Sequence, residues 1–513
     1  MKKYIKDIIK DDYKNWNTGD LILINAGTGR GKTYFIKHIF NTYCIQNDKQ
    51  ILYLTNRTNL QNQIINDLGE NNKNITVKNY QKIENFILNG TLDLSVYDYI
   101  ICDECHYFFT DASFNIKTDL SFKKILENKN VCTILMTATA QILKYYFEHN
   151  HIKIDYKYKL ETDYSYLNNI ICFNNYESID GIIEDIPKDE QIIFFSSAKR
   201  ALEVAKKFNG TFICSEGNED GLWDKYIAPK TVKNEKGENE IVPTENYLEL
   251  QRIIETGTFQ NHILCCTTVL DNGINIKENT TVRHIIIDIL DIDEFIQCFG
   301  RKRIFEGEKV NLYFYGWNDK KRINGFRTKV VNSLERADYL KQNGENEYVK
   351  MKFKTDIYDT KIIDDIVGED GQLHKIINEC MYMKYDMDKT TYDCLLDKKY
   401  PIRFIDLVCT SLKIKIEDVV EIETEIQKQS LEEFLDSIIG MKLYKDEQKI
   451  LKERFEEYGL KARSLGINTL NGYIKDKKLS FIIEPGERKS YRDEHNKIKK
   501  EKSHWIVGKI TYK

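Results

Sequence analysis

The sequence is poor in the residues that mark fibrous, disulfide-rich and membrane proteins. Only 5 of its 513 residues are proline and 26 are glycine, which excludes a collagen-like or proline-rich chain. The 12 cysteines are too sparse for a disulfide scaffold, so we expect free thiols. No run of 18 apolar residues occurs, and the N-terminal segment MKKYIKDIIKDDYK soon returns to charge. We therefore expect neither a membrane-spanning helix nor a secretion signal, and a cytoplasmic location.

An excess of charge of one sign is also missing. The chain has 76 Lys and Arg residues against 80 Asp and Glu residues, a formal net charge of -4. Any nucleic-acid surface would therefore have to be a local basic patch. Hydrophobic residues make up 41% and charged residues 30%, which is typical of folded globular chains. At roughly 100 to 200 residues per domain, the length predicts about three domains.

Two successive series of short apolar runs, separated by polar or amphipathic stretches, organise residues 20–320. This alternation is expected of parallel sheets covered by helices. The first series reads DLILINA, QILYLT, YDYIICDE and VCTILMTAT, and the second reads IICF, QIIFFSS, TFICS, HILCCTT, RHIIIDI and VNLYFYGW. The sequence therefore predicts an α/β chain with two similar lobes, at residues 1–165 and 166–325.

Three other segments differ from this pattern. Residues 216–245 lack periodicity and carry Gly, Pro and mixed charge, which indicates a surface insertion. From about residue 330 apolar residues recur every three or four positions, which predicts a helical accessory region at 326–445. Residues 446–513 form a further predicted module.

A glycine-rich loop follows the first apolar run. The strand-like LILIN leads into AGTGRGKT and then into the amphipathic segment YFIKHIFNTY. Glycines allow consecutive backbone N–H groups to close around phosphate oxygens at the start of a helix, with Lys on the β- and γ-phosphates and Thr on the metal. The candidate nucleotide-binding residues are Gly27, Thr28, Gly29, Arg30, Gly31, Lys32 and Thr33, and Ala26 replaces the first glycine of the pattern.

An acidic pair follows the apolar run YDYIIC. A phosphate loop needs one carboxylate near Mg²⁺ and a second to polarise the attacking water, and Asp103 and Glu104 fit these two roles. The same segment contains Cys102, Cys105 and His106 in the C-x-x-C-H spacing of covalent haem attachment. Haem attachment requires export, and zinc would need distant ligands such as His149 and His151, so we expect neither haem nor a metal thiolate.

At this point the chain resembles a superfamily 2 helicase, the class that includes the DEAD and DEAH proteins. DECH is a variant of the DEAH box, and the resemblance covers about residues 15–320. The motifs occur in the family's order, as AGTGRGKT, TNRTNLQNQ (55–63), DECH, Thr137-Ala138-Thr139, IIFFSSAKRALEVAKKF, CTTVLDNGINI (266–276) and QCFGRKR (297–303).

The resemblance implies two RecA-like lobes that hold ATP and Mg²⁺ between them, with arginines of the second lobe stabilising charge in the transition state. Arg301 matches the first arginine of the family's QxxGRxxR pattern, and Gln297 matches its glutamine. Ile304 stands at the second arginine position, and the nearest candidate is Arg303, one residue early. The implied catalytic residues are Asp103, Glu104, Gln297, Arg301 and Arg303, with Thr33 and Asp103 at the metal.

The resemblance also implies a nucleic-acid path across both lobes, held mainly by phosphate contacts. Arg57, Thr267 and Thr268 match such contacts, and a solvated surface charge is the alternative for Arg57. His106, Thr137, Thr139 and Gly273 match positions that couple hydrolysis to lobe movement. Simple turns are the alternatives for the threonine segment and for Gly273. An upstream glutamine motif of the DEAD-box kind is absent, so the choice of nucleotide stays open.

The last segment has the order of elements of a winged helix. Residues 446–458 read as one helix, Lys461–Leu465 as a second, and TLNGYIKDKKL as a third capped by Asn468 or Thr469, before two strands that flank a basic stretch. Residues 471–513 contain 12 Lys and Arg against 6 Asp and Glu. We expect this module to contact nucleic acid, with protein binding or a solvated tail as the alternatives.

These features together predict a cytoplasmic ATP- and Mg²⁺-dependent helicase or translocase that acts on nucleic acid, with DNA favoured over RNA. One alternative is a nucleic-acid-stimulated ATPase switch or remodeller that does not unwind, in a mobile-element or defence system. Another is a DNA-binding regulator whose ATPase fold is a scaffold, although the intact Lys32, Asp103 and Glu104 argue against it.

Overall fold

The computed structural model covers the chain of 513 residues and divides it into two compact units. The first contains Met1–Ile170 and Asp180–Val419, and the second contains Ile171–Ile179 and Val420–Lys513. The structure describes residues 3–56, 64–65, 68, 73–88, 91, 93–113, 115, 117–233, 238–268, 276–277, 280–355, 362–368, 370–462, 464–487, 490–492, 497–500 and 503–510.

The first lobe is a parallel sheet with helices on both faces. Its strand order is β3-β2-β4-β5-β1-β6. The strands are β1 (Leu21–Ala26), β2 (Ile51–Thr55), β3 (Ile75–Asn79), β4 (Tyr99–Cys102), β5 (Cys132–Thr137) and β6 (Tyr156–Leu160). Alternate residues of β1 enter two separate cores, with Leu21 and Leu23 in one and Ile22 and Ile24 in the other. Burial on both faces explains why these strands read as continuous apolar runs.

Helices and turns of the first lobe connect these strands. They are α1 (Ile5–Ile9), η1 (Asp12–Asn15), α2 (Lys32–Tyr34), η2 (Phe35–Phe40), α3 (Asn41–Gln46), α5 (Tyr80–Leu88), α6 (Tyr107–Thr110), η4 (Asp111–Ser113), α7 (Thr118–Glu127) and α8 (Gln141–His149). The stretch from α2 to α3 is one continuous helix that widens to π geometry over Phe35–Phe40.

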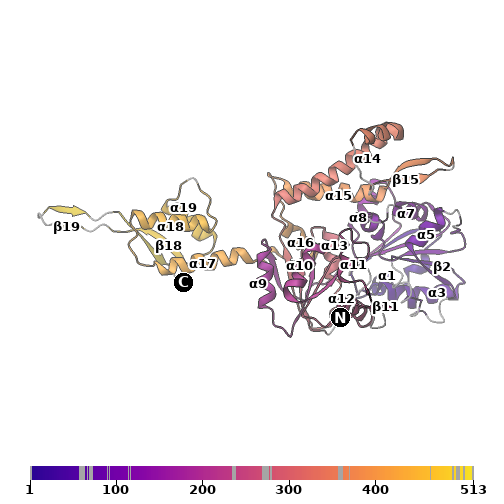
Figure 1. Cartoon of the computed structure of the whole chain (residues 1–513), viewed down its shortest axis with the longest axis horizontal. Coiled ribbons are helices and arrows are strands. Elements are labelled where there is room, and N and C mark those ends of the chain that lie inside the picture. Colours follow the sequence, from indigo (N-terminus) through magenta and orange to yellow (C-terminus); the bar gives the residue numbers. More distant parts are fainter. Residues whose placement is uncertain are drawn as a thin grey trace. The chain divides into compact units, whose positions relative to one another are not determined.

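The second lobe repeats this architecture (Figure 1). Its central strands β14-β13-β8-β12-β9 are all paired in parallel. The elements are β8 (Gln191–Phe195), α10 (Ala198–Phe208), β9 (Thr211–Ile213), α12 (Glu245–Thr256), β12 (Ile263–Cys266), β13 (Val282–Ile287), α13 (Ile292–Phe299) and β14 (Val310–Tyr315). The boundaries between the two units fall inside three elements. These are β7 (Leu167–Phe173), α9 (Glu177–Asp185) and β17 (Val419–Glu421). The predicted pair of tandem parallel-sheet, RecA-like lobes is confirmed.

The segment 216–245 lies between these strands and contains a hairpin that the sequence pattern did not predict. After the short helix α11 (Leu222–Tyr226), β10 (Lys230–Lys233) pairs antiparallel with β11 (Asn239–Val242). All residues of both strands are exposed. Strands without a buried face leave no alternation of apolar and polar residues, so periodicity could not reveal them.

The accessory region is mainly helical but includes two strands. Its elements are α14 (Lys320–Thr355), β15 (Ile363–Val367), β16 (Leu373–Ile377), α15 (Glu379–Leu396), α16 (Phe404–Leu412) and η6 (Ile416–Asp418). The predicted helical region also contains β15 and β16, which pair antiparallel and which the sequence pattern did not predict. Gly371 makes the tight turn between them with a φ of 74°. α14 and α15 pack along each other (Figure 1).

The second unit has its own apolar core, built on α17 (Ile422–Ser437), α18 (Lys445–Glu457), α19 (Ile467–Asp476), β18 (Phe481–Pro485) and β21 (Trp505–Lys509). A second, exposed hairpin joins β19 (Ser490–Arg492) to β20 (Ile498–Lys500). The order of helices and hairpin agrees with a winged helix, which remains a prediction.

Local details of this unit differ from the sequence expectations. Helical spacing of apolar residues continues in the sequence from the accessory region into residues 446–458, but the structure breaks it between α17 and α18, where Gly440 has a φ of 71°. The predicted helix Lys461–Leu465 is wrong, because its described residues are not helical. α19 begins one residue after Gly466, so Asn468 and Thr469 lie inside the helix and do not cap it.

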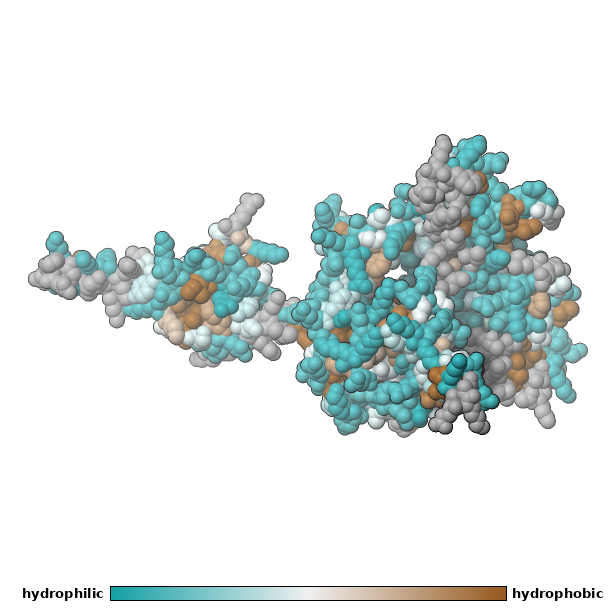
Figure 2. Space-filling model, viewed as in Figure 1, coloured by the Kyte–Doolittle hydropathy of each residue, from teal (hydrophilic) through white to brown (hydrophobic). Residues whose placement is uncertain are grey.

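The surface of the described chain is mainly hydrophilic in the view of Figure 2, with scattered apolar side chains. None of the described helices is long and apolar enough to cross a membrane.

Candidate nucleotide-binding cleft

The phosphate loop has the closed geometry that the sequence predicted. β1 ends at Ala26, and the chain turns through Gly29 and Gly31, whose φ angles are 72° and 81°. Only glycine adopts this left-handed region without strain. Lys32 is 7% exposed, and its Nζ donates to the carbonyl oxygen of Ala26 at 2.7 Å. The Lys32 side chain thus lies over the loop, where the phosphate oxygens of a nucleotide would bind.

The acidic pair lies at the carboxyl end of β4, one strand removed from β1 in the sheet. Asp103 is 4% exposed, and the Tyr53 hydroxyl donates to its Oδ2 at 2.5 Å. Burial, and then the charge of Glu104, raise the pKa of Asp103 to about 6. The Tyr53 hydroxyl also bonds to Thr33, so one tyrosine connects both predicted metal ligands.

Glu104 occupies an unusual position. Its φ is 48°, a left-handed value that is uncommon for a residue with a side chain. Burial acts to raise its pKa, but the positive charges of Lys32 and of the arginines Arg301 and Arg303 hold the pKa of Glu104 below its usual value. A carboxylate that stays ionised beside these cations can accept a proton from water.

The second lobe contributes the two arginines to this cleft. A Cβ added at Gly29 would lie 3.1 Å from the Nη1 of Arg303. A Cβ added at Gly300 would lie 2.9 Å from the Oγ1 of Thr28. Residues just after α13 therefore approach the phosphate loop of the first lobe closely.

The backbone explains why Arg303 can replace an arginine expected at position 304. Ile276 and Lys302 form a parallel bridge, and the N–H groups of Ile276 and Arg303 bond across it. In such an extended segment, side chains two residues apart share a face. Arg301 and Arg303 thus share the face toward the cleft. Lys302 turns away, and its Nζ contacts Glu308 at 2.7 Å.

A chain of hydrogen bonds joins His106, which lies beside Glu104, to the second lobe. The Nδ1 of His106 lies 3.6 Å from the Oε2 of Glu104 and 3.1 Å from the Oγ1 of Thr137. Thr137 donates to the carbonyl oxygen of Thr139 at 2.7 Å. The Oγ1 of Thr139 in turn accepts from the Nε2 of Gln297 at 3.0 Å. Burial lowers the pKa of His106 to about 4, so the ring is neutral near pH 7.

Other predicted site residues lie elsewhere. Thr267 and Thr268 follow β12 and line a separate pocket of the second lobe. Arg57 and Gly273 lie outside the described residues. Sequence reasoning missed Tyr53 and Tyr80, whose hydroxyl donates to the carbonyl oxygen of Asp103 at 2.8 Å. Tyr53 interrupts the apolar run ILYLT, and that polar atom in a buried strand was the available signal.

The donor set fits a magnesium nucleotide. Among the described residues no group of three His, Cys, Asp or Glu side chains could hold a metal alone. Mg²⁺ at phosphates needs only one or two protein oxygens, because phosphate and water complete its shell. Thr33 and Asp103 supply such oxygens, and the raised pKa of Asp103 reflects a buried carboxylate that a cation would stabilise.

The cysteines beside the acidic pair are shielded thiols. Cys102 and Cys105 are both fully buried and free. Burial raises the pKa of each thiol, which disfavours the thiolate that metal binding requires.

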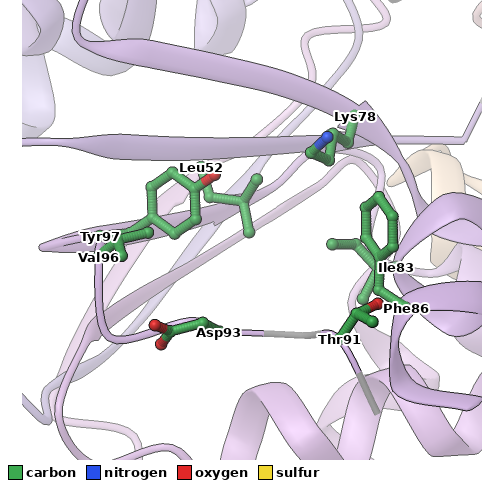
Figure 3. A pocket seen from close by; sticks show the side chains of 8 residues that line it. All are labelled: Leu52, Lys78, Ile83, Phe86, Thr91, Asp93, Val96 and Tyr97. Atoms are coloured by element: carbon green, nitrogen blue, oxygen red, sulfur yellow. The ribbon is translucent and has the colours of Figure 1, made fainter. Parts of the chain in front are cut away.

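A pocket of about 200 Å³ in the first lobe is separate from this cleft (Figure 3). Val96 and Tyr97, which help to line it, precede β4, whereas Asp103 follows that strand. Lys78 covers the ring of Phe86 there at 4.9 Å.

Comparison with protein families finds a match within the first lobe. The family model described as "Schlafen group 3, DNA/RNA helicase domain" matches residues 19–168. The first lobe is similar to a helicase domain. This match contains the phosphate loop and the acidic pair, and it supports the superfamily 2 resemblance. A sequence comparison with curated proteins finds no match.

Solved helicase structures also align with the chain, at low similarity. S. cerevisiae Dbp5 bound to RNA and ADP BeF3 is 15% identical, and the alignment covers 57% of this chain and 79% of the Dbp5 chain with a TM-score of 0.41. DEAD-box helicase Mss116 bound to ssRNA and UDP-BeF is 13% identical, with coverages of 89% and 85% and a TM-score of 0.42. A DEAD box protein from Methanococcus jannaschii is 16% identical, with coverages of 63% and 88% and a TM-score of 0.33.

Proposed function

We propose that this protein is a nucleic-acid-dependent ATPase that works as a helicase or translocase. The observation that carries this proposal is the approach of Arg303, from the second lobe, to Gly29 in the phosphate loop of the helicase-like first lobe. An ATPase assembled from two lobes completes its site only when they close, which allows a nucleic acid bound to both lobes to control hydrolysis.

The side chains of the cleft have distinct roles in this proposal. The loop amides and Lys32 bind the phosphates, while Thr33 and Asp103 would hold Mg²⁺, which supplies charge neutralisation at the phosphates when bound. Glu104 accepts the proton of the attacking water, and Arg301 and Arg303 stabilise the charge that develops on the transferred group. Gln297, Thr139 and Thr137 connect the reaction to lobe movement through their hydrogen bonds.

We further propose that DNA is preferred over RNA, in the cytoplasm. The arrangement of α18, α19 and the β18–β21 hairpin supports this preference, since winged helices commonly place a helix in a DNA groove. Phosphate release should be measured with single-stranded DNA, duplex DNA and RNA side by side, together with displacement of a labelled strand. Stimulation by DNA with displacement supports the proposal. Hydrolysis that no nucleic acid stimulates contradicts it.

A nucleic-acid-stimulated switch that does not unwind is the second candidate. α15 favours it, because this helix contacts both lobes. Its Cys380 and Met383 join a core of the first lobe, while the Nζ of Lys384 lies 2.5 Å from Asp291 of the second. Such a connection restricts the lobe separation that repeated translocation steps require. Stimulated hydrolysis without strand displacement identifies the switch.

A further inference from the structure

A pocket of about 310 Å³ opens at the carboxyl edge of the second lobe's sheet, away from the phosphate loop. It is lined by residues that lie within two positions of the ends of four adjacent strands and by aromatic side chains of α14 and α15. The residues that the argument uses are Thr267, Thr268, Asp288, Trp317, Phe326 and Tyr392. In open parallel sheets, ligands bind beyond the carboxyl ends of strands where the connections diverge to opposite sides. β8 is such a point, since β12 and β13 flank it.

Trp317 is an unusual residue for the wall of this pocket. It is 5% exposed, and its indole N–H has no hydrogen-bond partner among the described residues. Its φ of 49° is a rare value for a bulky residue. A buried donor without an acceptor destabilises the fold, and backbone strain gathers at ligand sites. Both features indicate that an acceptor atom of a ligand completes this position.

The walls favour a flat, uncharged ring. The rings of Trp317 and Phe326 lie 6.0 Å apart, and those of Phe326 and Tyr392 lie 6.4 Å apart. The guanidinium of Arg322 already covers the indole at 4.2 Å, where a ligand cation would otherwise sit. Aromatic walls of this kind stack well on nucleobases, whose ring nitrogens and carbonyl groups are acceptors.

The charges of the pocket argue against a phosphate inside it. Asp288, Asp291 and Glu294 all line it, and Asp288 is 5% exposed. Its carboxylate accepts from the hydroxyl of Ser196 at 2.8 Å and can also accept from the exocyclic amino group of a base. Asp291 is already paired with Lys384, so a phosphate deep in the pocket would be repelled chiefly by Asp288 and Glu294.

We propose that this pocket takes one unstacked base of a single strand whose backbone passes Thr267 and Thr268. The inference rests on the proposed function, because those threonines are its predicted phosphate contacts. The volume is near the lower end of ligand sites, roughly 300 to 1,000 Å³, which suits one base and excludes a duplex. A base held here would fix the position of the strand on the second lobe while the lobes close.

The first test compares a strand with its backbone. Fluorescence anisotropy measures the affinity for a ten-nucleotide mixed-sequence strand and for a fully abasic strand of equal length, each made as DNA and as RNA. Base stacking on aromatic side chains is worth roughly 1 to 3 kcal/mol per base, and roughly 1.4 kcal/mol is tenfold in affinity. We expect Phe326→Ala, a half-buried position, to reduce the ratio of the two affinities by about fivefold or more. Tyr339→Ala, on the same helix but outside the pocket, should keep the wild-type ratio.

The outcomes separate this inference from the proposed function. If the wild-type protein binds neither strand, both the proposed function and the base pocket are contradicted. If the wild-type protein binds the strand but Phe326→Ala leaves the affinity ratio unchanged, only the base pocket is overturned.

The second test observes Trp317 directly. The chain has four tryptophans, so 5-fluorotryptophan labelling gives four fluorine resonances, and Trp317→Phe assigns one of them. We expect the ten-nucleotide strand to shift the Trp317 resonance. A mixture of the free nucleosides at the same base concentration should shift it far less. Equal shifts would assign the pocket to free nucleosides, and no shift with a bound strand would mean that the base lies elsewhere; either result overturns the proposal.

Discussion

At the scale of single residues, the cleft depends on which side chains share a face. The bridge between Ile276 and Lys302 holds residues 301–303 extended, so Arg301 and Arg303 point the same way. The family pattern places its two arginines three residues apart, whereas Arg301 and Arg303 are two residues apart. The backbone geometry nevertheless lets both positive charges act on Glu104.

Glu104→Gln tests the proposed proton acceptor. Because Gln cannot accept a proton, we expect hydrolysis to fall by about 100-fold or more, while the affinity for ATP stays within a few-fold of wild type. Phosphate release and the binding of a fluorescent ATP analogue measure these two quantities. The matched control is Glu127→Gln, an exposed position on α7, which should hydrolyse ATP normally. Normal turnover by Glu104→Gln would remove this residue from the reaction.

Asp293→Asn tests a buried carboxyl group in α13. Burial, and then the charge of Asp291, raise the pKa of Asp293 to about 7, from an ordinary value of 3.8. The folded state therefore binds this proton more tightly than the unfolded state, and stability is lost as the pH rises from about 4 to about 7. We expect the free energy of unfolding to fall less between pH 5 and pH 8 in the variant than in wild type. Urea titrations at both pH values measure it, and an equal fall in both proteins would contradict the assignment.

The sequence predicts the site residues that belong to motifs, but not those that reach the site from distant segments. Lys32, Asp103 and Glu104 sit in motifs whose chemistry requires their spacing, and the structure brings them together. Tyr53 and Lys384 belong to no motif. Their roles arise from contacts between distant segments, which local periodicity does not encode.

At the scale of secondary structure, α15 is the element that connects the two lobes. The Nζ of Lys384 contacts Asp291 at the start of α13 and also Asp388. Burial alone would lower the pKa of Lys384, but these two carboxylates raise it well above its usual value. α13 ends at Phe299, two residues before Arg301, so the ion pair joins α15 to the helix that precedes both cleft arginines.

Lys384→Met tests this connection. Removing one partner of a buried ion pair leaves uncompensated carboxylates, so we expect a loss of about 3 kcal/mol or more in the free energy of unfolding. The control on the same helix is Lys389→Met, whose ion pair with Asp393 is partly exposed and worth less than about 1 kcal/mol. Denaturant titrations compare the two variants. Equal losses would show that the Lys384 pair is no more important than a surface pair.

The hairpin of β19 and β20 is the second element with a testable role. The three residues of β20 are all exposed and include Lys499 and Lys500. Each phosphate contact contributes roughly 0.9 to the slope of log affinity against log salt concentration. If both lysines contact phosphates, Lys499→Gln combined with Lys500→Gln should therefore reduce the magnitude of this slope by about one to two. The control removes two exposed lysines of α18, Lys445 and Lys449. The same salt dependence in both double variants would place the hairpin away from nucleic acid.

Element prediction succeeded where burial imposes a pattern. The two-sided burial of β1, β4 and β5 produces apolar runs, and these strands were predicted from the sequence alone. The exposed β10–β11 hairpin and the β15–β16 hairpin have at most one buried face, so their sequences resemble loops or helices.

At the scale of the whole molecule, the chain combines two parallel-sheet lobes with a second unit that has its own core. The sequence predicted the two lobes from their alternating apolar runs, whereas the start of the last module at residue 446 stays a prediction, since the second unit includes Val420–Lys513. It could not predict that the accessory helices also build a pocket on the second lobe, since Phe326 and Tyr392 are 66 residues apart in the chain but line the same cavity.

The most direct measurement is nucleic-acid-stimulated phosphate release by Arg303→Ala, with nucleotide affinity measured in parallel. Arginines that stabilise the transition state are worth roughly 10³ to 10⁵ in rate, so we predict a loss of about 100-fold or more with nearly unchanged ATP affinity. Lys302→Ala is not a neutral control, because Lys302 forms a buried ion pair with Glu308. The control is Lys309→Ala, at an exposed position. Stimulated hydrolysis at the wild-type rate in Arg303→Ala would contradict the two-lobe ATPase.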